Sequence, residues 1–415
     1  MKKSIAFITK VAFALTALTF FSCRDVIFET IRGEVELDDA KVSGDINSIV
    51  RYTMGGTEYL FADNGRLWRK SMAQTTKKVT KTNSDGTKTE VDTDPPIYIN
   101  NPTDAAPYGG KWYEFSKKGI ADDAHVIHLA ADETVLYALT GVLKKDSDTG
   151  YNVVTKKTLY YHTSDETEEW QEVTFYNSEG ERDTTVIAPK LAAQLYCTNS
   201  IQKAHRRAYL CLENSTIYKL EAGAAKQLKG TGSATGVLDY PSTNCVSCAW
   251  IETSFNTGAE DKVYFSSYAA MITDETSTSE ASIMYYGNGS DVYYIRKDSD
   301  PTQATNWTKS ISLSTIYALA YTATHLVAGT KEGLLYATLE NDVPKTKVTL
   351  ANTSSTLSSY YRVQNVIAAD PAFSATAGDL YATTIIYGST TSTGANVKNV
   401  GLWSYYPGRN KWNRE

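Results

Sequence analysis

The sequence has no surplus of basic residues. Its 415 residues contain 41 Lys and Arg against 47 Asp and Glu, which gives a formal net charge of −6. Proteins that bind nucleic acid or anionic headgroups depend on basic patches. We therefore expect no nucleic-acid partner, and no contact with lipid through surface charge.

Long helices and phosphate-binding loops are also missing. After the first 22 residues, no segment sustains apolar residues at a 3.6-residue period over several turns. No glycine-rich loop opens a helix, which removes the usual nucleotide-binding hypotheses. We expect no cofactor.

Cysteine and histidine are scarce, with five of each, and they form no metal-binding motif. His125 and His128 lie three residues apart in a predicted strand, where side chains alternate, so they are expected on opposite faces. Cys245 and Cys248 have C-x-x-C spacing but diverge on the same argument, and no second pair follows. We predict no metal site.

Two other cysteines leave a choice open. Cys197 is placed in the first strand of a predicted unit and Cys211 in the second, so the two could be cross-strand neighbours. In an oxidising compartment such a pair could form a disulfide, although many cross-strand pairs stay reduced.

What the sequence does contain, at its start, is an export signal. Lys2 and Lys3 precede an almost continuous apolar run from Ile5 to Phe21. Lys10 interrupts this run, which is shorter than the ~20 residues that a spanning helix usually needs.

The apolar run ends in Phe20-Phe21-Ser22-Cys23, which resembles the lipobox of bacterial lipoproteins. In that family the Cys is acylated and becomes the first mature residue. The resemblance implies a signal peptide over residues 1–22 and a lipid on Cys23, with residues 23–45 as a tether. Phe20 departs from the family's preferred Leu. An ordinary cleaved signal and an uncleaved anchor are the alternatives.

The rest of the chain favours β-structure, because Tyr (29) and Trp (7) suit a pleated, half-buried surface. One unit recurs: an apolar strand, a turn, a second strand, a turn, and a branched residue followed by an aromatic one. The third-strand pairs are Leu67-Trp68, Leu159-Tyr160, Ile217-Tyr218, Val292-Tyr293, Leu335-Tyr336 and Leu402-Trp403.

Four strands repeated around an axis are typical of a β-propeller blade. We predict an all-β fold over residues 46–415, a propeller of four-stranded antiparallel blades. Six blades are counted, and a seventh could lie hidden in an insertion; a pair of β-sandwiches is the structural alternative. In the fourth unit the second strand is placed at Val263-Tyr264-Phe265, and in the last at Leu380-Tyr381-Ala382.

One turn carries a second resemblance. Residues 163–170 resemble the Asp-box of sialidase-type propellers, Ser/Thr-x-Asp-x-Gly-x-x-Trp: Thr163, Asp165 and Trp170 fit, and Thr167 replaces the Gly. In that family the Asp binds the turn backbone and the Trp packs between blades. The resemblance therefore implies a structural motif and no activity.

An exported carbohydrate-active hydrolase of sialidase-like fold is the alternative function. It would need an Arg cluster, a Tyr nucleophile paired with a Glu, and an Asp acid. Arg206, Arg207, Tyr361 and Arg362 are isolated candidates, and the family's early Arg-Ile-Pro signature is absent. We assign no catalytic residue and favour a protein that is not an enzyme.

Long insertions between second and third strands, at about 141–157, 266–282 and 388–399, are expected to share one face. Functional residues concentrate on loops held by a rigid scaffold. We predict that Tyr151, Tyr268, Met271 and Tyr387 bind a partner there; solvated, variable loops are the alternative. The insertion at about 71–108 is predicted to be a mobile polar loop on the opposite face.

Together these features predict a lipid-anchored, extracytoplasmic binding protein, periplasmic or surface-exposed. It would recognise a protein or glycan of the cell envelope or outside the cell. We expect a monomer that touches the membrane only through its lipid.

Overall fold

The structure is a computed structural model. It describes residues 42–71, 74–76, 78–92, 98–100, 112–184, 187–188, 193–197, 203, 206–212, 216–227, 237–239, 249–252, 262–265, 271–273, 283–296, 304–321, 325–341, 343–349, 361–368, 386–392, 401–406 and 411–414.

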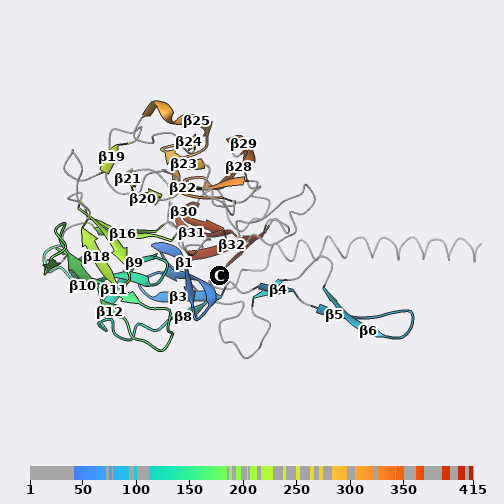
Figure 1. Ribbon diagram of the computed structural model, residues 1–415, viewed down its shortest axis with the longest axis horizontal. Helices are drawn as coiled ribbons and strands as arrows, with labels where there is room; N and C mark the ends of the chain where they lie inside the picture. The colour runs from blue at the N-terminus through green and yellow to red at the C-terminus, as the bar shows by residue number, and fades with distance from the viewer. Residues whose placement is uncertain are drawn as a thin grey trace, which may run out of the picture.

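The regular elements that these residues form are β-strands and one short 3-10 helix, η2 (Ala304–Asn306). The first sheet contains β1 (Ser48–Met54), β2 (Thr57–Asp63), β3 (Leu67–Ser71) and β8 (Tyr113–Glu114), antiparallel and in that order (Figure 1). Within this part of the chain no helix has the length and apolar character needed to cross a bilayer.

The second and third sheets repeat this pattern. The second contains β9 (Ala124–Ala131), β10 (Leu136–Lys145), β11 (Asn152–His162) and β12 (Gln171–Glu172). The third contains β15 (Ala193–Cys197), β16 (Ala208–Leu212), β17 (Ile217–Glu221) and β18 (Ala224–Gln227), widened by β13 (Thr174–Tyr176) and β14 (Arg182–Asp183). Because β13 runs parallel to β18, the chain leaving the second sheet extends the edge of the third.

Four further sheets follow. Their strands are β19 (Val237–Asp239), β20 (Ala249–Glu252) and β21 (Lys262–Phe265); β22 (Met271–Thr273), β23 (Ile283–Asn288), β24 (Asp291–Arg296) and β25 (Thr308–Ser312); β26 (Ile316–Tyr321), β27 (His325–Thr330), β28 (Gly333–Glu340) and β29 (Val343–Thr349); and β30 (Tyr361–Ala368), β31 (Ile386–Ser392), β32 (Gly401–Tyr406) and β33 (Lys411–Arg414).

The prediction of an all-β chain is confirmed for the described residues. Five of the seven sheets are antiparallel and four-stranded, whereas the third has six strands and the fourth has three, each with one parallel pair. The predicted fourth unit is wrong: residues 263–265 lie in β21 and residues 292–293 in β24, and these strands belong to different sheets. Residues between them supply two more strands, β22 and β23, so one predicted unit is two sheets. In the last unit β31 pairs with β30 and β32, and residues 380–382 lie outside the described residues.

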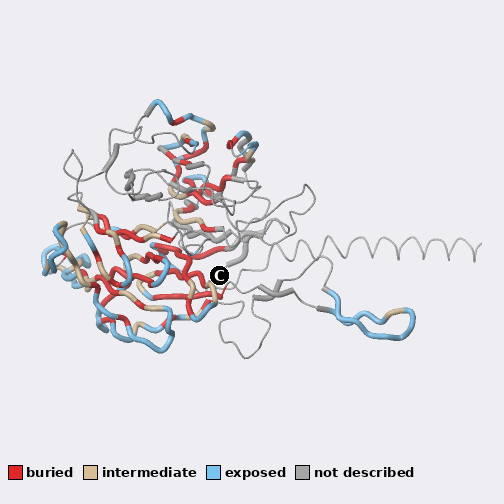
Figure 2. The backbone as a smooth tube through the Cα atoms, viewed as in Figure 1, coloured by how far each residue is buried: buried red, intermediate tan, exposed pale blue. Residues whose placement is uncertain are grey.

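Apolar side chains between neighbouring sheets form the core, shown as the buried interior in Figure 2. Tyr52 and Phe61 of the first sheet pack with Leu129 and Leu136 of the second. Other residues of β9 and β10 face the third sheet. Among them, Leu139 belongs to a second apolar cluster, which the second and third sheets share. The second sheet is therefore apolar on both faces, as a sheet packed between two others requires.

One edge strand of each of these seven sheets contacts the next in chain order: β1, β9, β15, β20, β22, β26 and β30. β30 in turn contacts β1. The Leu402 backbone N–H donates to the Val42 carbonyl (3.2 Å), and the Asn365 side-chain amide donates to the Ile46 carbonyl (3.1 Å). The first and last sheets are thus neighbours, with a shared apolar cluster.

The insertion at about 71–108 is more ordered than predicted. It contains the pair β4 (Gln74–Thr76) and β7 (Tyr98–Asn100), and a hairpin of β5 (Lys78–Thr82) and β6 (Lys88–Asp92). This hairpin projects from the rest of the molecule, and the part coloured in Figure 2 is exposed almost throughout. The expected loop is wrong for residues 78–92, which form a hairpin, and their mobility stays a prediction.

Candidate functional site

The turn that joins β11 to β12 contains Thr163, Asp165 and Trp170. Asp165 Oδ1 accepts hydrogen bonds from the backbone N–H (2.9 Å) and the hydroxyl (2.7 Å) of Thr167. These bonds lower the pKa of the Asp165 carboxyl. The carboxylate therefore stabilises the backbone of its own turn, and the hydrogen bonds described here are made within that turn.

Trp170 joins the second sheet to the chain segment that leaves the first. Its side chain is 3% exposed, its backbone N–H donates to the Lys118 carbonyl (2.9 Å), and its Nε1 donates to the Ser116 carbonyl (2.9 Å). The ring packs edge-on against Phe115 and His162. Trp170 thus has a structural role between two sheets.

Glu166, in the same turn, pairs with side chains of the first sheet. Its Oε1 lies 3.1 Å from Arg69 Nη1 and accepts a hydrogen bond from the Tyr59 hydroxyl at 3.4 Å. The Arg69 guanidinium also lies over the Phe115 ring, 4.7 Å from its centroid. Burial raises the pKa of Tyr59, so its phenol stays protonated at neutral pH and is a poor nucleophile.

Arg206, a candidate residue for the alternative hydrolase function, also makes contacts between two sheets. It is 1% exposed; its Nη2 donates to Glu58 (2.6 Å) and its Nη1 to the Thr53 hydroxyl (2.9 Å). Arg51 pairs with the same Glu58 carboxylate. Arg207 donates to the Arg206 carbonyl (3.0 Å). The side chains of Tyr361 and Arg362 lie outside the described residues.

The cysteines expected to be cross-strand neighbours are reduced thiols. They do occupy paired strands, but Cys197 lies opposite Ala208, and Cys211 lies opposite Gln194. An offset of three residues places the two thiols on opposite faces of the sheet. The disulfide considered from the sequence is therefore not formed, and it would require β15 to slide along β16. Cys245 and Cys248 lie outside the described residues.

A β-bulge changes the expected geometry of the two histidines. His128 lies opposite Leu139 and His125 opposite Gly141, because the register shifts between Leu139 and Thr140. Leu139 and Gly141 share one face of β10, so the histidines do too, contrary to the strict alternation assumed from sequence. In the part of the chain that the structure describes, no three His, Cys, Asp or Glu side chains gather as a metal site requires.

Of the four predicted partner-binding residues, the structure fully describes one. Tyr151 is 76% exposed at the tip of the β10–β11 hairpin. Tyr268 lies outside the described residues, as do the side chains of Met271 in β22 and Tyr387 in β31. The predicted insertion at 141–157 is not a loose loop: its residues extend β10 and β11 as a paired hairpin with a tight turn.

The exposed large hydrophobic residues of the described chain gather on two hairpins. Leu143 (37%), Tyr151 (76%) and Val153 (40%) lie on the β10–β11 hairpin. Val79 and Val91, directly opposite each other, lie on the β5–β6 hairpin. Clustered exposed apolar side chains mark interaction surfaces more often than scattered ones do.

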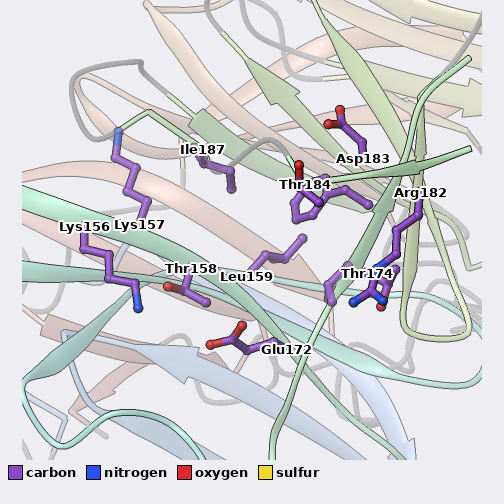
Figure 3. Close-up of a pocket in the computed structure, with 12 residues that line it drawn as sticks. Lys156, Lys157, Thr158, Leu159, Glu172, Thr174, Arg182, Asp183, Thr184 and Ile187 are labelled. Carbon is purple, nitrogen blue, oxygen red and sulfur yellow. The ribbon is translucent and has the colours of Figure 1, made fainter.

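A groove of about 310 Å³ lies at the base of the β10–β11 hairpin. Figure 3 shows Lys156 and Lys157 of β11 along one side, and Arg182 and Asp183 of β14 along the other. Leu159, Ile187 and Phe175 supply apolar surface, and Glu172 adds a second carboxylate. The groove offers charge and hydrogen bonds for binding, without a convergent set of reactive groups. Sequence reasoning missed it because β13 and β14 come from the connection between two units.

Comparisons with known proteins add only a general likeness. No protein-family model and no curated protein matches the chain. Among solved structures, it is similar to a nidogen/laminin complex, with 11% identity, a TM-score of 0.37, and coverage of 86% of this chain and 92% of that one.

It is also similar to the PQQ-bound aldose sugar dehydrogenase of Streptomyces coelicolor, with 10% identity, a TM-score of 0.37, and coverage of 89% and 96%. A third similar structure is PorZ, described as a surface component of the type-IX secretion system of Porphyromonas gingivalis. It has 8% identity, a TM-score of 0.38, and coverage of 87% of this chain and 56% of that one. These neighbours are β-propeller-like, and the likeness is one of general sheet arrangement.

Proposed function

We propose that this chain is a lipid-anchored, extracytoplasmic binding protein whose projecting hairpins recognise a protein partner of the envelope or outside the cell. Cys23 would carry the lipid, residues 23–45 would form the tether, and the sheets would form a propeller. Seven blades, one more than the six counted from the sequence, fit the seven consecutive sheets and the contact of β30 with β1.

The observation that carries this proposal is the placement of exposed apolar side chains. All five large ones among the described residues lie on two hairpins, while Arg51, Arg69 and Arg206 are buried in ion pairs, those of Arg69 and Arg206 between sheets. A scaffold that uses its charges internally and displays apolar hairpins is suited to binding.

Affinity capture tests the proposal. The mature chain, residues 24–415, is immobilised and exposed to the envelope fraction of its own cells. We expect a discrete partner to be retained. A variant with Tyr151→Ser and Val153→Thr should retain much less of it, because these changes remove exposed apolar surface without touching the core.

The matched control is Val173→Thr, a change in a buried residue that should lower stability but not selectivity in material that remains folded. The proposal fails when no envelope component is retained above a blank matrix. It also fails when the hairpin variant retains the same component equally well.

A further inference from the structure

The β5–β6 hairpin is a two-stranded sheet with two open edges. It projects from the other sheets (Figure 1), and within the described residues β5 and β6 pair only with each other. Residues 79–82 of β5 and 88–91 of β6 are all exposed. A two-stranded hairpin alone is marginally stable in water, and added strands stabilise it. Each outer edge of this hairpin can therefore accept another strand.

The turn of the hairpin determines which backbone groups face outward. The Asn83 N–H donates to the Thr87 carbonyl (2.8 Å), so these two residues form a hydrogen-bonded pair. Hydrogen-bonded and non-hydrogen-bonded pairs alternate along an antiparallel ladder. In the observed register, the pairs that contain Lys88 and Glu90 are therefore non-hydrogen-bonded. The backbone N–H and C=O groups of these two residues point away from β5, along the open edge of β6.

The same two residues carry opposite charges on one face of β6. Lys88 and Glu90 lie two positions apart in the strand, and both are exposed. Their neighbours across the hairpin are Thr82 and Thr80, which are uncharged. The charges of Lys88 and Glu90 are therefore not matched across their own hairpin.

The order Lys88-Thr89-Glu90 is complementary to itself when two copies run antiparallel. A pairing centred on Thr89 sets Lys88 of each copy opposite Glu90 of the other, and it joins the outward backbone groups of these residues. Opposite charges across a ladder stabilise it, whereas like charges destabilise it. A pairing centred on Glu90 would set two carboxylates opposite each other. The charges therefore favour the register centred on Thr89.

Charged residues on an edge strand also serve to prevent unwanted pairing. A single sign of charge suits that purpose, because identical strands then repel each other. The β6 edge instead carries one charge of each sign, at Lys88 and Glu90. This pattern favours pairing between identical strands.

We propose that the β6 edge binds a second copy of this chain, so that two hairpins join into one four-stranded antiparallel sheet. The two-fold axis would pass by Thr89, and Val79 and Val91 of both copies would lie on the same face of the sheet. This dimer would replace the monomer expected from the sequence. It would leave the β10–β11 hairpin for the partner of the proposed function, and it does not depend on that function.

An engineered cysteine traps the pairing. Two short strands bury less than the ~1,000 Å² typical of a stable interface, so we expect a weak, reversible dimer. Thr89→Cys in the mature chain, residues 24–415, sets two thiols in a non-hydrogen-bonded pair with Cα atoms about 4.5 Å apart, within reach of a disulfide. With oxidised glutathione, this variant should form several-fold more covalent dimer than Thr80→Cys, an exposed position on β5. The parent chain corrects for native thiols.

Charge reversal tests the register. Lys88→Glu alone and Glu90→Lys alone each set like charges opposite each other in both pairs. Each should weaken self-association, measured by sedimentation, by at least about tenfold. An equimolar mixture of the two variants restores opposite charges in both pairs and should associate like the parent chain. The variant with both changes should do the same, and because its net charge is that of the parent, it separates pairing from a general charge effect.

A parent chain that stays monomeric, with no more cross-linking in Thr89→Cys than in Thr80→Cys, would overturn the inference. Preferential cross-linking of Thr80→Cys would place the contact on β5 and overturn the assignment to β6. Stronger association of Lys88→Glu would leave the charges as edge protection only. No recovery in the mixture and in the double variant would contradict the reciprocal pairs. After any of these results, the proposed function still stands if the immobilised chain captures its envelope partner.

Discussion

At the scale of single residues, a buried acid links the first two sheets. Asp63 is 0% exposed and accepts hydrogen bonds from the Asn47 side-chain amide (2.6 Å) and from the Ser48 hydroxyl. The Ser48 oxygen accepts the backbone N–H of Leu129 in β9 at 2.8 Å. Burial raises the pKa of Asp63 to about 7, since the charged form loses its hydration.

This raised pKa predicts a pH-dependent stability. Between the unfolded value of about 4 and the folded value of about 7, the folded state binds the extra proton. Stability should therefore be highest at the acidic end of this window and fall as the pH rises through it. In Asp63→Asn, the difference in unfolding free energy between pH 5 and pH 8 should shrink by on the order of 2 kcal/mol.

Chemical denaturation at both pH values measures this difference. Asp165→Asn is the control, because that carboxylate lies exposed in a turn and its lowered pKa places its titration below pH 5. An unchanged pH dependence in Asp63→Asn would show that Asp63 ionises like an exposed carboxyl.

At the scale of elements, Trp170 of the β11–β12 turn should contribute more to the stability of the fold than Asp165 of the same turn. Trp170→Ala removes a buried ring and the contacts that it makes between two sheets. It should lower the free energy of unfolding by about 3–5 kcal/mol. Asp165→Ala removes hydrogen bonds in an exposed turn and should cost much less. Tyr151→Ala, at an exposed site, should change little.

Denaturant titration of the three variants gives this order directly. Gly119→Ala offers a check on the same contact, because an added Cβ would lie 2.3 Å from the Trp170 carbonyl oxygen, at a φ of +98° that favours glycine. An equal loss for Asp165→Ala and Trp170→Ala would contradict the interface role of the ring.

Elements with strong local signals could be predicted from the sequence. Leu67-Trp68 lies in β3 as expected, because a short turn joins two strands of clear apolar character there. The split of the fourth unit was missed although a local hairpin marks it: β23 pairs directly with β24, whereas β21 pairs with β20 in another sheet.

One residue of the candidate site could also be singled out from a local pattern in the sequence. Tyr151 stands out in the sequence as an aromatic residue in a polar insertion, and it is exposed. The bulge beside His128 depends on register, which no local pattern specifies. The groove depends on β13 crossing to the third sheet, a pairing between separate units.

At the scale of the whole molecule, the lipid would decide where the hairpins operate. Several acyl chains anchor a protein stably, whereas one alone is marginal. On the proposed function, membrane attachment would depend on Cys23, and a long tether would leave the sheets free to present both hairpins.

Cys23→Ser should therefore release the protein from the membrane without unfolding it. The native chain should stay in the pellet through a high-salt wash and enter the detergent phase of a Triton partition, while the variant should appear in the soluble, aqueous fraction. Both should show the same thermal midpoint, because the proposed tether separates Cys23 from the sheets. Cys197→Ser is the matched control and should remain in the detergent phase. A Cys23→Ser protein that stays membrane-bound through the wash would point to an uncleaved apolar anchor over residues 5–21, and the lipoprotein assignment would then be wrong.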